Sequence, residues 1–354
     1  MFNKKSNSII SSILQLLIIT LVISTFVTCD EDDNNGYTGP WVEVPTPGGP
    51  DSRLNACYFT SSDNGWACGN SYNFEEERSY PLLIHWNGVE WEEYPYGGWF
   101  DGEEFINIKI TDISFSGPSN GWAVGNLAVN HSENFGFILR YDGNQWYIFK
   151  SHFEWRVDHV YCISEDDVWF VVYEKYSGDS LYHWDGDEYE RYYVGTDIRD
   201  IAFSSSTEGL AVGLYYSVYH WDGMKWEQIW KDTSRPEPHN AVSYYEPNKA
   251  WIVGSQRMGK WINGEYTYWY EWDYDYEDIH FSHSDEGWMI GCGPDPSDPL
   301  GYGGYIWHWN GNNWERMEKP PDMGANAVFS VDYYDAWIVG WGKNNECWSW
   351  NYEP

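Results

Sequence analysis

Short runs of alternating apolar and polar residues recur along the chain, and turn-forming residues bound each run. The run NGWACGN at residues 64–70 returns as SNGWAVGN at residues 119–126. Related runs surround five further central residues, which are Trp169, Leu210, Trp251, Trp288 and Trp337. The seven copies, numbered repeats 1 to 7, are spaced by about 45 residues on average, a period typical of units of four short strands.

Each repeat predicts four strands, named a to d. An apolar residue nine positions before the central residue marks strand a, and the central run is strand b. Strand c ends in a marker such as YHWDGMKW at residues 219–226, and strand d begins at its last aromatic residue. Asp-Gly or Asn-Gly between two apolar runs favours a type I′ turn with positive φ at both residues, so we expect tight turns between strands c and d.

The first and last segments of this pattern complement each other. Repeat 7 supplies strand c as CWSWNYEP but no strand d, whereas GPWVEVPTP at residues 39–47 matches a strand d without strands a to c. We expect residues 41–44 to pair with CWSW at 347–350, because closure removes exposed sheet edges. The sequence therefore predicts an all-β, seven-bladed β-propeller of four-stranded antiparallel blades over residues 39–354, closed by its N-terminal strand.

The combined GWAVG and HWDGxxW pattern resembles the repeats of photosystem-II-assembly-factor-like and Asp-box (sialidase-like) propellers, and more loosely kelch repeats. The resemblance covers residues 41–354. An Asp box spaces its Asp, Gly and Trp one residue wider, so sialidase chemistry is not implied. The resemblance indicates the fold and adds an envelope assembly factor to the functional alternatives.

The first 29 residues predict a secretion signal, because two lysines precede an apolar segment that ends at Cys29. An acidic tether follows over residues 30–38. We expect lipidation of Cys29 and a bacterial cell-envelope location, on the outer membrane or cell surface, with membrane contact through the lipid anchor only. A plain membrane anchor is the alternative, since about 20 apolar residues can span a bilayer.

The formal net charge of −35 narrows the choice of partners. Nucleic acids and sulfated glycans are disfavoured, because their binding depends on Lys and Arg that neutralise the polyanion. Neutral glycans, cations and basic proteins remain, and we expect a monomer. The leading interpretation is non-enzymatic binding of a neutral glycan or a protein partner.

The binding face is expected where the loops vary. The a-to-b and c-to-d turns are short and uniform, whereas the b-to-c and d-to-a loops differ in length and lie together on the other face. Of 25 tryptophans, most occupy repeat positions expected to pack between blades, and six map to the variable loop face. Flat aromatic rings suit both sugar stacking and protein contact, although each could instead seal a gap between blades. The predicted ligand-binding residues are Trp99, Asp101, Glu103, Trp155, Trp230, Trp272, Asp273 and Trp341.

The segment YEWDYDYED at residues 270–278 alternates aromatic rings with carboxylates. This pattern predicts a strand with the rings on one side and the acids on the other. The acids either face water or form a cation patch, and calcium is the one cofactor considered, because it prefers oxygen ligands. The metal site itself is left unknown.

No catalytic motif stands out, and we expect no enzyme activity. A glycan-cleaving hydrolase or lyase that uses Asp101, Glu103 and Asp273 is the alternative. Cys57 and Cys68 could form a cross-strand disulfide in an oxidising compartment, or could be small core residues.

Overall fold

The computed structural model describes residues 39–49, 51–95, 107–130, 133–174, 178–195, 197–295, 302–320, 323–341 and 346–353. The expected signal, Cys29 and the tether lie outside these residues. Gly39–Pro354 forms one compact unit, whose described part is β-strand apart from turns, loops and one short 3-10 helix, η1 (Leu214–Tyr216). The described residues include no helix with the length and apolar character of a membrane span.

Repeats 1 and 2 form an eight-stranded sheet of two antiparallel sets. A single parallel contact, between Ser79 and Asn107, joins the two sets. The strands, in chain order, are β2 (Ser52–Ser61), β3 (Asn64–Asn73), β4 (Arg78–Trp86), β5 (Trp91–Glu93), β6 (Asn107–Gly117), β7 (Asn120–Asn130), β8 (Glu133–Tyr141) and β9 (Trp146–Phe153).

Repeats 3 and 4 form one four-stranded antiparallel sheet each, in the order a-b-c-d. The strands of repeat 3 are β10 (Arg156–Ser164), β11 (Asp167–Glu174), β12 (Gly178–Trp184) and β13 (Tyr189–Tyr193). Those of repeat 4 are β14 (Ile198–Ser205), β15 (Glu208–Gly213), β16 (Ser217–Trp221) and β17 (Trp226–Trp230).

Repeats 5 and 6 share a six-stranded sheet because two of its strands are unusually long. Its strands are β18 (His239–Glu246), β19 (Lys249–Ile262), β20 (Glu265–His283), β21 (Glu286–Pro294), β22 (Tyr302–Trp309) and β23 (Trp314–Met317). Strand β19 serves as strands b and c of repeat 5. Strand β20 pairs with β19 over residues 265–270 as strand d of repeat 5, then with β21 over residues 275–283 as strand a of repeat 6.

Repeat 7 is completed by the first strand of the unit. Its sheet contains β24 (Gly324–Asp332), β25 (Asp335–Trp341), β26 (Cys347–Tyr352) and β1 (Trp41–Val44). Strand β1 runs antiparallel to β26, with Trp41 opposite Tyr352 and Val44 opposite Ser349. The expected closing pair is therefore present, shifted by two residues toward the end of β26.

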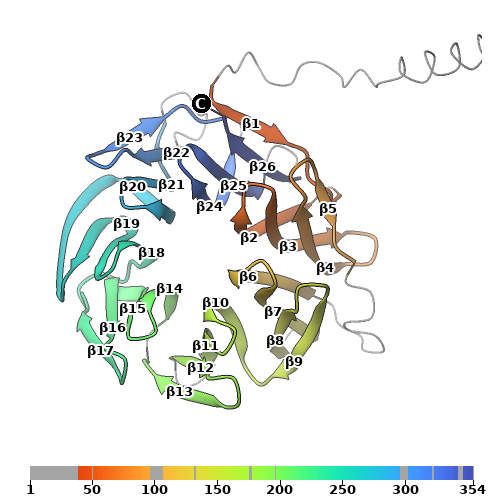
Figure 1. Ribbon diagram of the computed structural model, residues 1–354, viewed down its shortest axis with the longest axis horizontal. Coiled ribbons are helices and arrows are strands. Elements are labelled where there is room, and N and C mark those ends of the chain that lie inside the picture. The colour runs from red at the N-terminus through yellow and green to blue at the C-terminus, as the bar shows by residue number, and fades with distance from the viewer. Residues whose placement is uncertain are drawn as a thin grey trace, which may run out of the picture. The chain divides into compact units, whose positions relative to one another are not determined.

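The innermost strand of each repeat contacts that of the next repeat, and β24 contacts β2, so the ring closes (Figure 1). The all-β propeller class predicted from the sequence is confirmed. The a-to-b and c-to-d turns lie at one end of the strands, and the b-to-c and d-to-a loops lie at the other.

The central tryptophans of the repeats are buried in the described core, as their periodic positions predicted. Each packs toward the following repeat. Trp122 contacts the ring of Phe170, with 5.8 Å between centroids, and Trp169 contacts Trp221 at 5.0 Å. Aromatic contact between neighbouring blades therefore stabilises the ring.

The type I′ prediction for the c-to-d turns is right only at Asn263–Gly264, where φ is 50° and 93°. The other described Asn-Gly and Asp-Gly pairs open four-residue turns, as between the paired residues Trp86 and Trp91. The Asn87 side-chain oxygen accepts hydrogen bonds from two backbone N–H groups of its turn, both at 3.0 Å. This side-chain bonding stabilises the wider turn, in which Gly88 alone has positive φ.

Cys57 and Cys68 are free thiols in the structure, so the disulfide alternative is wrong. Cys57 pairs with Ala67 across the two strands, one position away from Cys68. A shift of one residue turns the side chains to opposite faces of the sheet. Cys57 consequently packs with Trp337, whereas Cys68 packs with the core between repeats 1 and 2.

Candidate functional site

An arginine–aromatic surface lies at the loop face, where β17 and β20 leave their sheets. It consists of Trp230, Arg235, Tyr268, Tyr270 and Trp272. The rings of Tyr270 and Trp272 stack at 11°, with 4.7 Å between centroids. The Arg235 guanidinium lies 5.3 Å and 4.8 Å from these two centroids. Trp272 is 56% exposed, so the stack presents an open aromatic face.

Strand alternation explains how this surface forms. Side chains two residues apart on β20 point to the same side, which brings Tyr268, Tyr270 and Trp272 together. Trp230 at the end of β17 packs against Tyr268, with 5.0 Å between centroids. Trp269 points the other way and contacts Trp251 at 5.8 Å. The surface is therefore built from two neighbouring repeats.

A buried arginine supports this surface from below. Arg257 is 0% exposed, and its guanidinium carbon lies 3.6 Å from the ring centroid of Tyr216 and 4.3 Å from that of Tyr268. Its Nη2 donates a hydrogen bond to Asp232 at 2.9 Å. A buried cation between aromatic faces gains strong cation–π attraction, because little water screens it.

The Asp232 carboxylate holds the d-to-a loop in place. It accepts hydrogen bonds from Ser234 and Arg257, which keep the pKa of Asp232 low, at about 2. The loop that carries Arg235 is thereby tied to the arginine beneath the surface. Arg235 itself forms no ion pair with any described residue, which leaves its guanidinium available to a ligand.

The structure brings only some of the predicted ligand-binding residues together. Trp230 and Trp272 belong to the arginine–aromatic surface, and Asp273 is exposed directly beside Trp272. Trp155 packs half-buried against the core between repeats 2 and 3. Trp341 lies beneath Arg53, whose guanidinium carbon is 5.5 Å from the ring centroid. Three predicted residues, Trp99, Asp101 and Glu103, lie outside the described residues.

The aromatic residues of segment 270–278 divide between two places. Tyr274 and Tyr276 pack against Trp307 of repeat 6, with centroid distances of 5.3 Å and 5.2 Å. Only Tyr270 and Trp272 join the loop-face surface. Within the described residues, no group of three His, Cys, Asp or Glu side chains could hold a metal ion, and the carboxylates of this segment are included in that statement.

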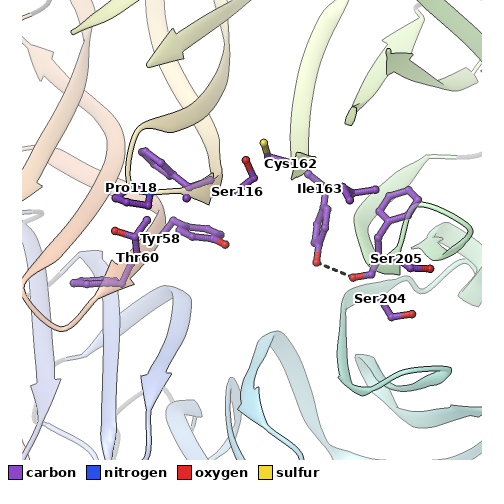
Figure 2. Close-up of a pocket in the computed structure, with 13 residues that line it drawn as sticks. Tyr58, Thr60, Ser116, Pro118, Cys162, Ile163, Ser204 and Ser205 are labelled. Atoms are coloured by element: carbon purple, nitrogen blue, oxygen red, sulfur yellow. Dashed lines mark hydrogen bonds between the residues drawn. The ribbon is translucent and has the colours of Figure 1, made fainter. Parts of the chain in front are cut away.

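A central cavity opens at the other face, among the short turns. A mouth of about 460 Å³ is lined by the ends of β2, β6, β10 and β14. Figure 2 shows Thr60, Ser116, Cys162 and Ser204 around this opening. The mouth shares Tyr58, Tyr161, Cys162 and Phe203 with a deeper space of about 250 Å³. This deeper space is lined by residues from the innermost strand of every repeat.

Three aspartates in the deeper space join neighbouring repeats. Asp112, Asp200 and Asp278 each accept a hydrogen bond at 2.8 Å from the next backbone N–H of their own strand. The second oxygen of each aspartate accepts a hydrogen bond from a backbone N–H group of the following repeat, at 2.8–2.9 Å. These donors belong to Val160, Val242 and Val328. These residues recur one position before the strand a marker in alternate repeats, a signal that the sequence analysis missed.

The aspartates lie in a poorly solvated place. Burial raises the pKa of Asp200 to about 8 and that of Asp278 to about 6. Burial alone would lower the pKa of His159, but the Asp112 carboxylate, 3.6 Å away, and the carboxylates of Asp200 and Asp158 raise it to about 9. Neither Lys nor Arg lines the two spaces.

The Cys162 thiol at the mouth has the properties of a structural cysteine. Burial raises its pKa to about 11, and its sulfur donates to the Ser164 carbonyl at 3.3 Å. A neutral thiol is a poor nucleophile, because the thiolate is the reactive form. Cys162 therefore contributes packing and a hydrogen bond at the mouth.

Comparison with known proteins agrees with the β-propeller class. No family model matches the sequence, and no curated protein matches it. The solved structure of YCF48 bound to D1 peptide is similar, with a TM-score of 0.62 and 15% identity, covering 90% of this chain and 98% of that one. YCF48 from Cyanidioschyzon merolae is similar with a TM-score of 0.61 and 16% identity, covering 88% of this chain and 99% of that one. The WD40 propeller domain of Doa1 has a TM-score of 0.58 and 10% identity, covering 90% of this chain and 98% of that one. At these identities the likeness concerns the fold alone.

Proposed function

We propose that this chain is a non-enzymatic binding protein that holds a protein partner on its loop face. The observation that carries the proposal is the exposed stack of Trp272 on Tyr270 beneath Arg235. Trp, Tyr and Arg are the residues that dominate binding energy at protein interfaces. Their rings are also held rigidly here, which lowers the entropy lost on binding.

Two further observations support a protein as the partner. One structurally similar propeller, YCF48, is described as bound to a D1 peptide. The net charge of −35 disfavours polyanions, while Arg235 provides a local donor for the carbonyl or carboxylate groups of a polypeptide. A neutral glycan is the alternative ligand for the same stacked rings, because sugars also pack on flat aromatic faces.

We expect Trp272→Ala and Arg235→Ala each to weaken partner binding about ten-fold or more without lowering Tm, because both residues are loop-face contacts outside the main core. The tagged protein and its variants are used to capture partners from native envelope membranes, and captured proteins are quantified. Val42→Ala, at an exposed apolar residue on the outer strand β1, is the control. Equal capture by all four proteins would contradict the proposal, and binding to a glycan array with no protein captured would favour the glycan.

The proposed location is the outside of the cytoplasmic membrane, with the propeller tethered through Cys29. It rests on the lysine-led apolar segment and the acidic residues after Cys29. We expect Cys29→Ser to block lipid attachment and to release the protein from membranes or leave the signal uncleaved. Mass spectrometry of the mature N-terminus and membrane fractionation test this. A wild-type protein without lipid, with its apolar segment intact, would identify a plain membrane anchor.

The strand c histidines His183, His220 and His308 support binding over catalysis. His183 is hydrogen-bonded to Asp167 at 2.8 Å and stacks on Trp169, with 4.3 Å between centroids. His220 and His308 repeat this arrangement with Glu208 and Glu286. These contacts fix the histidines inside the blades, away from the cavity and the loop-face surface. The alternative of a glycan-cleaving enzyme rests on Asp101, Glu103 and Asp273, of which only Asp273 is described.

A further inference from the structure

We propose that the central cavity at the short-turn face is a second binding site, which receives a lysine or arginine side chain from a basic polypeptide. This site is distinct from the loop-face surface and lies at the opposite end of the innermost strands. The mouth would hold the carbon stem of the side chain, and the deeper space would hold its charged end. The surrounding turns would contact the rest of the partner.

The mouth matches the carbon stem of a long cationic side chain. Five aromatic residues line it, which are Tyr58, Phe59, Phe115, Tyr161 and Phe203. Lysine and arginine bury their methylene groups against apolar surface while the charged end remains polar. The aromatic faces also attract the cation itself. The volume of about 460 Å³ is sufficient to admit one side chain together with its backbone.

The deeper space matches the charged end. Tyr58 and Tyr161 line both spaces and lie two strand positions above the level of the carboxylates, roughly 7 Å at about 3.3 Å per residue, so a long side chain that enters between these rings can reach the carboxylates. Asp112, Asp200 and Asp278 all line this space, and the one ion pair described for them joins His159 Nδ1 to Asp112 Oδ2 at 3.6 Å. When ionised, the three carboxylates therefore exceed the compensating positive charge.

The turns around the mouth match a basic partner. Lys225 is the one cation among the residues that connect strands a to b and c to d within the described repeats. The same turns carry the carboxylates of Asp63, Glu90, Asp142, Glu165, Asp166, Asp185, Asp187, Glu188, Asp222 and Asp285. Such a field steers a basic protein toward this face and speeds its association.

Exposed apolar side chains provide further contact area on the same face. Val89 and Met224 at c-to-d turns are 81% and 80% exposed, and Tyr334 at an a-to-b turn is 55% exposed. Apolar residues set among acids suit a partner that presents basic and apolar residues together. The cavity would then hold the residue at the tip of that partner's loop or at its terminus.

Binding of a cation here should strengthen as pH rises from about 5 to 8. The carboxylates of Asp278 and Asp200, with pKa values of about 6 and 8, ionise in this range, whereas His159 keeps its charge up to about 9. Burial lowers the pKa of His280 to about 4, so this imidazole stays neutral. The tyrosines and cysteines of the lining are also neutral, because burial raises the pKa of Tyr58, Tyr161, Tyr244, Cys57 and Cys162.

The test uses a short fluorescent peptide of alternating glycine and lysine, and the same peptide with every lysine acetylated. Ser204→Trp places a large ring at the mouth, because Ser204 is half-buried and belongs to the lining (Figure 2). Ser206→Trp adds the same ring on the exposed turn, outside the cavity lining. Asp200→Asn removes one deep charge and keeps an oxygen acceptor, and Glu92→Gln removes one charge from the exposed outer strand β5.

We expect the lysine peptide to bind the wild type, and Ser204→Trp to raise its Kd about ten-fold or more. Asp200→Asn should raise Kd several-fold at pH 8 and flatten the pH dependence. Ser206→Trp, Glu92→Gln and the loop-face variant Trp272→Ala should each stay close to wild type. If Ser204→Trp does not fold, Ser116→Phe at the opposite wall replaces it.

Three results would overturn the proposal. Undetectable binding of the lysine peptide would show that the cavity takes no cation. Equal binding by Ser204→Trp and the wild type would show that the peptide contacts the acidic surface generally. Equal binding of the acetylated peptide would show that charge is not recognised. None of these results affects the loop-face proposal, which is tested by different variants.

Discussion

Trp122→Ala is expected to lower the free energy of unfolding by about 3–5 kcal/mol, a large share of a typical domain's stability. Trp122 is fully buried and contacts the rings of Phe149 and Phe170, at centroid distances of 4.9 Å and 5.8 Å. The Arg140 guanidinium carbon also lies 5.1 Å from its ring centroid. Truncation would leave a cavity between repeats 2 and 3 and remove the support of that arginine.

Denaturant unfolding followed by circular dichroism measures this loss. Trp272→Ala is the matched control, because it makes the same substitution at a residue that is 56% exposed. The control should remain within about 1 kcal/mol of wild type. If both variants lose the same stability, burial at the blade interface does not explain the role of Trp122.

Removal of β1 is expected to destabilise the whole propeller. A chain that begins after residue 47 would lose the pairing of β1 with β26 and the buried ring of Trp41, which contacts Trp288 at 5.1 Å. It would also expose β26 as an open sheet edge, which promotes aggregation. A chain that begins at Gly39 keeps β1 and is the control.

Thermal unfolding and light scattering compare the two truncated chains. We expect the shorter chain to melt at a clearly lower temperature, or to aggregate, and the Gly39 chain to behave as the full propeller does. Similar melting of the two chains would mean that β1 is a dispensable edge. A lower Tm for both would assign stability to residues before Gly39.

The repeat pattern predicted most of the fold because each copy carries the same strand and packing signals. Trp122 and its equivalents mark strand b, and residues 41–44 were recognised as a strand without a sheet of its own. The turn type was missed because it depends on the Asn87 side chain, which bonds to the backbone and widens the turn. The continuity of β20 had a signal that was not used, since no Gly or Pro occurs between Glu265 and His283.

The candidate sites were less predictable because they depend on neighbours in space. Trp230 and Trp272 were selected as tryptophans without a repeat position, but their grouping required β17 and β20 to be placed side by side. From the sequence alone, Arg257 would be predicted to be an ordinary surface cation. Its burial is explained by its contacts with Tyr216 and Tyr268, which only the structure shows. The cavity arises where strands from all repeats meet, a geometry that no single repeat contains.

The closing pair of strands also sets the order in which the propeller can form. Synthesis produces β1 before any other strand of the ring and produces its partner β26 last, and the bond from Ser349 to the Val44 carbonyl spans 305 residues of sequence. Closing so large a loop costs more entropy than forming a hairpin between adjacent strands. The repeats can therefore fold one after another as they emerge, while the ring itself can close only when the final repeat has been made.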